Sequence, residues 1–254
     1  MARAALREPG LPEASLSGPE HDVRLLVDHR DDLVYERKRI QKRLRWHCHD
    51  LEIELTLPPR VLDRYVWLDR LEGVLCALPQ STRRRIALDQ LGRVRELTKD
   101  VRSLERELRG LVGELAPDLI AIPGCSAINA AHLIGQTAGA TRFSGEAAFA
   151  MHVGCAPLPV SSGQSNRHRL NRCGNRRLNS TIHMIAVTQA RMHPPAIVYM
   201  ERKQTEGMSY REALRCLKRQ LARVVFKTML RTERASVGHV LRARFSADCV
   251  AIAV

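Results

Sequence analysis

The chain has 254 residues, 44% of them hydrophobic, so it is long and apolar enough to bury at least one ordinary core and is not a disordered tail. Its 41 Lys and Arg against 27 Asp and Glu give a formal charge of +14, which favours a polyanionic partner: nucleic acid first, an anionic membrane surface second. No apolar run reaches the length of about 18 residues that a membrane span needs, and the N-terminal stretch lacks the apolar centre of a signal peptide. We therefore expect a soluble, cytoplasmic protein that does not engage a membrane.

The cysteines and histidines give little support for a metal site. The seven cysteines contain no C-x-x-C pair or other metal-ligand spacing, so we interpret them as reduced, mostly buried thiols. A metal alternative would use His47 with His49, or His168 alone, but no histidine has a partner at zinc-site spacing. We expect no metal and no other cofactor to be bound by this chain.

The N-terminal half predicts two long amphipathic helices. After a loose lead-in at residues 1–18, a helix begins near Glu20 and is stopped by Pro58-Pro59; its apolar stripe is Val23, Leu26, Leu33, Ile40, Leu44, Leu51 and Leu55. A second stripe steps by three and four residues over three heptads: Val94, Leu97, Val101, Leu104, Leu108, Leu111 and Leu115. A shorter helical stretch is expected around residues 65–78.

Sustained heptads with charged flanks favour a coiled-coil arm over residues 19–116, which we expect to form a homo-oligomer through its leucines. The alternative is that these helices belong to an ordinary all-α core. After Pro117 the sequence pattern changes to short predicted helices separated by Pro and Gly, which predicts a second domain at residues 117–231. The tail at residues 232–254 is left unassigned. The predicted fold is mainly α: a long coiled-coil helical hairpin, then a small helical domain with a helix-hairpin-helix-like element.

The last clear helix of the second domain opens with a capping box, Ser209 to Glu212. Its apolar side carries leucines and valines. The opposite side is interpreted as solvated surface that adds to the positive field and carries Arg211, Arg215, Lys218, Arg219 and Lys227.

The stretch IPGCSAINAAHLI, residues 122–134, has the order of a helix-hairpin-helix element. In such an element the turn at Gly124 offers backbone N–H groups to a nucleic-acid phosphate. Ser126 stands where a second glycine is usual, which would restrict close approach of the backbone. A plain helix-to-helix turn is the alternative.

The stretch PLPVSSGQSNRHRLNRCGNRRLN, residues 157–179, concentrates arginine. Between Glu146 and Glu201 lie 54 residues without an acid, and arginine's planar fork can hold two phosphate oxygens at once. Gly163 and Gly174 allow tight turns, and Asn175 can cap a helix that begins next. The predicted nucleic-acid-binding residues are Gly124, Arg167, Arg169, Arg172, Arg176 and Arg177; the alternative is a loop whose arginines bind passively or pair with acids elsewhere.

The serines before Gly163 raise a second possibility. A serine hydroxyl beside these arginines could attack a phosphodiester, if the arginines stabilised the charge that develops on phosphorus. Most serines before a glycine are turn residues, so that alternative stays open.

Together these features resemble one family. The run from IPGCSAINAAHLI through GNRRLN to HPPAIVYMERKQTEGMSYREALRCLKRQLARVVFKTML resembles the C-terminal domain of the IS one-ten family of bacterial insertion-sequence transposases, and DVRLLVDHRDDLVYERKRIQKRLRWHCHDLE resembles the helical arm of that family. The resemblance covers roughly residues 2–230. Its motifs are specific in combination: the P-G turn, R-F-x-S, G-x-x-P, S-S-G and the basic G-N-R-x-L-N.

The resemblance implies DNA transposition by a two-part enzyme. A RuvC-like domain whose four acids bind magnesium comes first, a coiled-coil arm follows, and a C-terminal domain carries a serine that attacks DNA. By position that catalytic serine is Ser162, with Ser161 as the rival, and a structured guide RNA is an expected partner beside DNA. Ser126 and Cys173 depart from the family, which commonly has glycine at both positions.

A larger departure concerns the acids, because only Glu8 and Glu13 occur in residues 1–18. We therefore expect a truncated or decayed transposase, or a chain whose true start lies upstream, with magnesium bound only in the absent domain and no activity by this chain alone. The competing class is a non-catalytic nucleic-acid-binding protein derived from a transposase.

Overall fold

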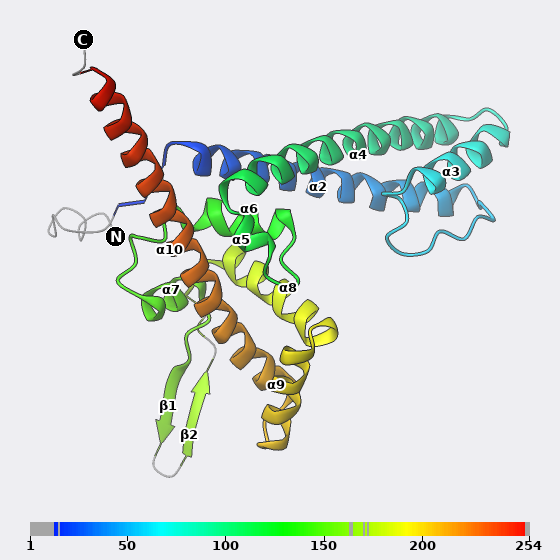
Figure 1. Ribbon diagram of the computed structural model, residues 1–254. Coiled ribbons are helices and arrows are strands. Elements are labelled where there is room, and N and C mark those ends of the chain that lie inside the picture. The colour runs from blue at the N-terminus through cyan, green and yellow to red at the C-terminus, as the bar shows by residue number, and fades with distance from the viewer. Residues whose placement is uncertain (1–12, 15, 163–164, 170, 172, 252–254) are drawn as a thin grey trace, which may run out of the picture. The chain divides into compact units, whose positions relative to one another are not determined.

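The computed structural model describes residues 13–14, 16–162, 165–169, 171 and 173–251. Over these residues the chain is mainly α, as predicted, with a single two-stranded antiparallel sheet that the sequence did not predict (Figure 1). Two compact units emerge: residues 25–108 form one, and the residues on either side of that segment form the other. The division falls inside the two longest helices of the N-terminal half, α2 (Pro19–Asp50) and α4 (Thr82–Leu115), and the domain limits drawn from the sequence stay predictions.

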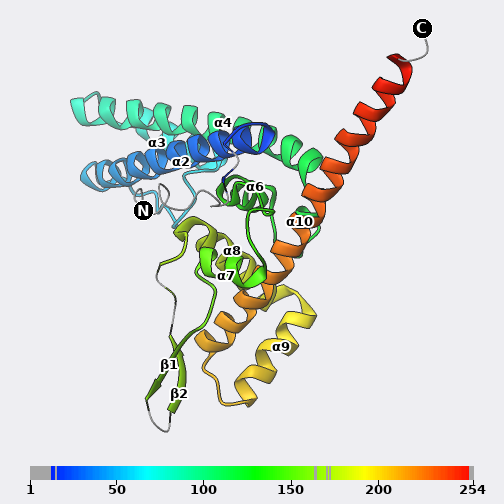
Figure 2. The ribbon, with the colours of Figure 1, turned by 90° about the vertical axis from the view of Figure 1, so that its left-hand side faces the viewer.

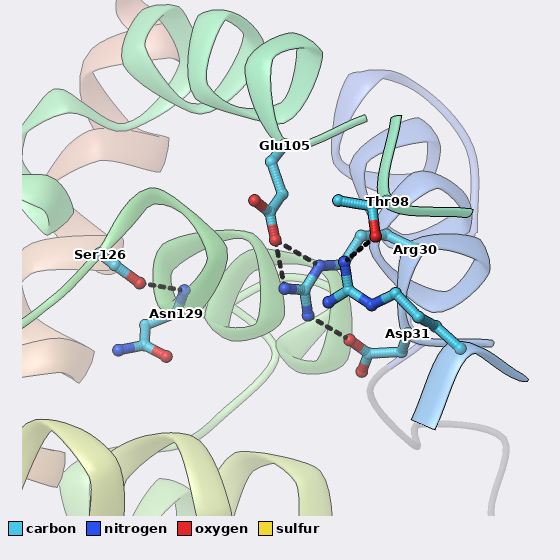
Figure 3. A network of polar contacts seen from close by, with 7 residues as sticks. Arg30, Asp31, Thr98, Glu105, Ser126 and Asn129 are labelled. Atoms are coloured by element: carbon cyan, nitrogen blue, oxygen red, sulfur yellow. Dashed lines mark hydrogen bonds and ion pairs between the residues drawn. The ribbon is translucent and has the colours of Figure 1, made fainter. Parts of the chain in front are cut away.

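The unit at residues 25–108 is built on an antiparallel pair of helices. As residue numbers rise along α2, the numbers of their polar partners on α4 fall, in the pairs Arg30 with Glu105, Arg37 with Thr98 and Asp50 with Arg83. Figures 1 and 2 both show the two helices side by side, and Figure 3 shows Arg30 between Glu105 and Asp31. The expected helical hairpin is therefore present within a single chain.

The shorter α3 (Tyr65–Ala77) completes the core of this unit. Its leucines at 68, 71 and 75 are fully buried against Leu44 of α2 and Leu91 of α4. Four residues of the heptad stripe of α4, Val94, Leu97, Val101 and Leu108, are at most 2% exposed, whereas Leu104, Leu111 and Leu115 are half-buried. Because these side chains are covered within one chain, their burial does not require a second copy, and homo-oligomerisation stays a prediction.

The helix α2 ends at Asp50, earlier than the Pro58-Pro59 stop expected from the sequence. Glu52 adopts a left-handed backbone with φ 49°, and the N–H of Ile53 donates to the carbonyl of Cys48 at 3.1 Å. The N–H of Glu52 donates to the carbonyl of His49, which completes a Schellman closure. This closure usually has glycine at the left-handed position, so the sequence carried no signal for it.

The second unit contains eight further elements. Their bounds are α5 (Pro117–Ile120), α6 (Ala127–Thr137), α7 (Glu146–Val153), β1 (Leu158–Ser162), β2 (Ser165–Arg169), α8 (Arg176–Met192), α9 (Pro194–Thr205) and α10 (Tyr210–Ala251). α8 and α10 pack against each other and against α7 and α9, with Phe149 stacked on Phe226 at 5.3 Å between ring centroids. Residues up to 251, which the sequence left unassigned beyond 231, continue α10.

The predicted capping box at the start of α10 is confirmed. The Glu212 carboxylate accepts a hydrogen bond from the backbone N–H of Ser209 at 2.9 Å, and the Ser209 hydroxyl donates to the same oxygen at 2.6 Å. This arrangement satisfies an N–H group that the helix itself cannot pair.

We predict that Leu97→Ala lowers the free energy of unfolding by about 2–5 kcal/mol, because it leaves a cavity in a fully buried stripe. Leu25→Ala is the control, since Leu25 is 57% exposed and its truncation should change stability by less than about 0.5 kcal/mol. Urea unfolding measures both. Equal losses in the two variants would contradict the packing described here.

Candidate nucleic-acid interface

The serines and the first arginines of the predicted cluster lie on a β-hairpin. β1 pairs with β2 so that Ser162 faces Ser165, Val160 faces Arg167 and Leu158 faces Arg169. Ser162 is thus the last residue of β1 before the tip. Figures 1 and 2 show the hairpin projecting away from the helices of its unit.

The structure describes these predicted residues to different extents. Arg169 is exposed, whereas the side chains of Ser161, Ser162 and Arg167 and the whole of Arg172 lie outside what is described. Their contacts therefore stay predictions. Val160, two residues before Ser162, is 45% exposed, as expected of a strand that does not belong to the core.

The base of the hairpin is closed by two glycines in contact. Gly154 ends α7 in a left-handed conformation with φ 73°, and Gly174 lies directly against it. A Cβ atom added to Gly174 would come within 2.2 Å of the Gly154 nitrogen, so only glycine fits. Next to this contact the N–H of Asn175 donates to the carbonyl of His152 at 2.7 Å, which fixes the end of α7 against the start of α8.

Asn175 caps α8, as the sequence predicted. Its Oδ1 accepts from the N–H groups of Arg177 at 3.0 Å and Leu178 at 3.1 Å. Arg176 and Arg177 follow in the first turn, both exposed, and no acid accompanies them there. Cations at a helix N-terminus oppose the helix dipole, so this turn combines two sources of positive potential that a bound anion would relieve.

A cavity of about 450 Å³ adjoins this turn. It is lined by Gly154, Asn171, Gly174, Arg176, Asn179, Ser180, His183 and Lys218. Three of the lining side chains are basic, and the cavity draws on α7, α8 and α10 together with the segment between β2 and α8.

Asn179 holds the wall of this cavity together. Its Nδ2 donates to the carbonyls of Val153 and Gly154, both at 3.0 Å, and its Oδ1 accepts from Nζ of Lys218 at 2.7 Å. The side chain therefore joins the end of α7 to α10. An aspartate here could not donate to the two carbonyls, so the amide is required for both contacts.

Lys218 is a buried cation. It is 8% exposed, and burial lowers its pKa. No carboxylate pairs with it in the described part of the chain. Burial, and then the charge of Lys218, also lower the pKa of His183. Burying an ammonium without an opposite charge is unfavourable, so the cavity suits an anion that restores that charge.

Lys218 corrects an expectation from the sequence, which placed it on the solvated side of the last helix with Arg211 and Arg215. The helical period alone could not reveal that Asn179 reaches this side of α10. Asn179 itself closes the G-N-R-x-L-N motif, and that motif was the available signal.

Gly124 is not part of this cavity. It turns the chain before α6 with φ +79°, and a Cβ atom added there would lie 3.1 Å from Cβ of Thr188. Thr188 lies twelve residues along α8 from Arg176, about 18 Å away on a regular helix. Ser126 caps α6, since its hydroxyl oxygen accepts a hydrogen bond from the N–H of Asn129 at 3.2 Å (Figure 3), and its effect on the approach of a phosphate stays a prediction.

The described residues do not fit a magnesium site. They contain no group of three or more His, Cys, Asp or Glu side chains placed to hold a metal ion. His47 and His49 belong to no such group, and His168 has no described side chain. Within the same part of the chain, no helix is both long and apolar enough to cross a membrane.

Two comparisons with known proteins bear on this site. Residues 116–201, which hold the hairpin and all of α8, match the family described as Transposase IS116/IS110/IS902 family. Over 257 residues the chain is 27% identical to the uncharacterized 44.8 kDa protein of insertion element IS116 from Streptomyces clavuligerus. That alignment covers 84% of this chain and 64% of the relative, so the chain spans a little under two thirds of the relative's length. Both matches are thus to insertion elements, and the family description names a transposase.

We predict that Gly174→Ala lowers the free energy of unfolding by about 2–3 kcal/mol, because the added methyl group overlaps the backbone of Gly154. The matched control is Gly113→Ala, since nothing lies within 4 Å of a Cβ atom there. Gly113 is in the helix α4, where alanine should stabilise by about 0.5–1 kcal/mol. Urea midpoints report both, and a neutral Gly174→Ala would show that the two glycines do not touch.

Proposed function

We propose that this chain is a DNA-binding transposase of an insertion sequence, and that it holds DNA at the start of α8. The observation that carries the proposal is the cavity beside Arg176, whose buried Lys218 has no carboxylate partner among the described residues. Phosphate is the anion that DNA offers, and arginine can bind two of its oxygens at once. The match to a transposase family supports DNA as the source of that phosphate.

We propose that the remaining arginines of the cluster contribute further phosphate contacts. Arg167 and Arg169 lie on β2, and Arg172 lies between β2 and α8, so the cluster would contact several successive phosphates. Contacts of this kind supply affinity without base specificity. Gly124 would be a separate backbone contact farther along the duplex, consistent with its position near the other end of α8.

For catalysis we propose Ser162 as the nucleophile, with Ser161 as the alternative. The Ser162 Oγ would form a bond to phosphorus while the bond from phosphorus to a deoxyribose oxygen breaks. The hydroxyl proton leaves the serine, and the departing deoxyribose oxygen takes up a proton. Exposed arginines near the start of α8 would stabilise the charge on the phosphoryl oxygens.

Magnesium chemistry would have to come from residues other than those described, since these offer no fitting ligand set. We therefore propose that strand transfer needs an acidic metal-binding domain supplied by a longer or partner polypeptide. A guide RNA and a homo-oligomer remain part of the proposal. The absence of a magnesium-ligand set among the described residues also favours the second candidate function, a non-catalytic DNA-binding protein that uses the same arginines.

The DNA contact predicts a change in salt dependence. Replacing Arg167, Arg169, Arg176 and Arg177 by Gln should make the slope of log K against log salt shallower by about three to four for duplex DNA, because about four phosphate contacts are lost. The matched control replaces Arg83, Arg93 and Arg95, all held in ion pairs with acids. If the slope became shallower only in the control set, the arginine cluster would not belong to the DNA interface.

The chemical step predicts that Ser162→Ala abolishes a covalent protein–DNA adduct while duplex affinity changes by less than about twofold. The assay adds an intact relative that supplies the metal site, and adducts are detected on denaturing gels with labelled 254-residue chain. Loss of the adduct in Ser161→Ala instead would move the assignment by one residue. An adduct that survives in both variants and in the double variant, or no adduct with the unmodified chain, would favour the non-catalytic candidate.

A further inference from the structure

The outer face of α2 carries an arrangement that the proposed DNA site does not use. Five side chains follow one another there at helical spacing: Tyr35, Arg39, Lys42, Arg43 and Trp46. At 100° per residue they fall within an arc of about 100°, and the two aromatic residues are about 16 Å apart along the helix axis. All five are exposed. We call these five residues the α2 outer face.

The cations of the α2 outer face are not neutralised. Arg39, Lys42 and Arg43 form no ion pair in the described part of the chain. The arginines of α4 differ, since Arg93 pairs with Glu36 and Glu96, and Arg95 pairs with Asp69 and Glu72. Acids thus hold Arg93 and Arg95, whereas no acid pairs with the three cations of the α2 outer face in the described part of the chain.

The aromatic residues are equally unusual in their exposure. Tyr35 is 66% exposed and Trp46 is 62% exposed, although the chain has only four Tyr and two Trp. Each has one contact that leaves a ring surface free: Nζ of Lys38 lies 5.5 Å from the Tyr35 ring centre, and the Trp46 ring meets His47 edge-on. Exposing large rings to water is unfavourable, which points to a partner with flat apolar faces.

We propose that the α2 outer face binds single-stranded DNA. Cations between two aromatic platforms suit a strand whose phosphates meet the charges while unpaired bases stack on the rings. A duplex hides its base faces and could use only the charges. Asp32 precedes the face and Asp50, paired with Arg83, follows it, so acids bound the site at both ends. The choice of DNA rests on the proposed function, because exchange of DNA strands exposes unpaired bases.

The first experiment uses Trp46 as the reporter. Trp67→Phe leaves Trp46 as the single tryptophan, and the titrant is a thymidine oligonucleotide of about 12 nucleotides. Stacking should quench Trp46 fluorescence as binding saturates. Tyr35→Ala and Trp46→Ala should each weaken binding, followed by anisotropy of the labelled strand, by about tenfold, while Tyr210→Ala, which removes an exposed tyrosine on α10, should not. Unquenched Trp46 at saturation would overturn the proposal.

A second measurement separates charge from stacking. Replacing Arg39, Lys42 and Arg43 by Gln should reduce the salt slope for the single strand by about two, whereas the ion-paired Arg83, Arg93 and Arg95 set should leave it nearly unchanged. A uridine oligonucleotide that binds more tightly than thymidine would reassign the face to RNA and overturn the proposal. So would a fall in sedimentation mass on Trp46→Ala, which would make a second copy of the chain the occupant.

The two proposals fail separately. Aromatic substitutions on α2 should leave duplex affinity unchanged, and substitution of the hairpin and α8 arginines should leave Trp46 quenching in place. Duplex binding that is unchanged in these arginine variants, with Trp46 quenching still in place, would therefore count only against the proposed function.

Discussion

The candidate site depends on one contact between two glycines. Gly154 and Gly174 touch through backbone atoms, and no side chain can be inserted between them. Their contact brings the end of α7 against the start of α8, which places Asn175 as a cap and Asn179 within reach of the α7 carbonyls. The hairpin emerges from this closure, so its orientation relative to α8 follows from a feature that carries no chemistry itself.

The buried Lys218 adds an energetic constraint. Removing an ammonium from water without an opposite charge is unfavourable, and a single neutral acceptor on Asn179 offsets only part of that cost. A core of this size could have used leucine there instead. Burial of Lys218 beside exposed arginines is less unfavourable if the cavity contains an anion, because one ligand then neutralises the buried cation and binds at the helix N-terminus together.

The sequence predicted those parts of the fold that follow from local patterns. Heptad spacing located α4, and the roles of Asn175 and Ser209 as helix-start residues were visible because capping depends on neighbours three residues away. The end of α2 was placed too late, since Glu52 takes a conformation that glycine usually adopts. The hairpin was missed because its strands lack the apolar alternation that marks a half-buried sheet.

The candidate site was only half visible for a related reason. Arginine clustering and the absence of acids can be counted along the chain, so the start of α8 could be predicted. Lys218 joins that site across 39 residues, through an amide whose orientation depends on the glycine contact. A contact between residues that are distant in the sequence leaves no local sequence pattern. The helical period of α10 instead suggested that Lys218 is exposed to solvent.

The late position of Lys218 in the chain has a consequence for biosynthesis. A nascent chain emerging from the ribosome presents the hairpin and all of α8 before the segment that carries Lys218, and Glu233, which binds the N–H groups of Ala140 and Thr141, follows later still. Contacts between distant segments form only once both are available. The exposed arginines are thus present on an unfinished chain, whereas the complete cavity arises only after α10 has been synthesised and has docked.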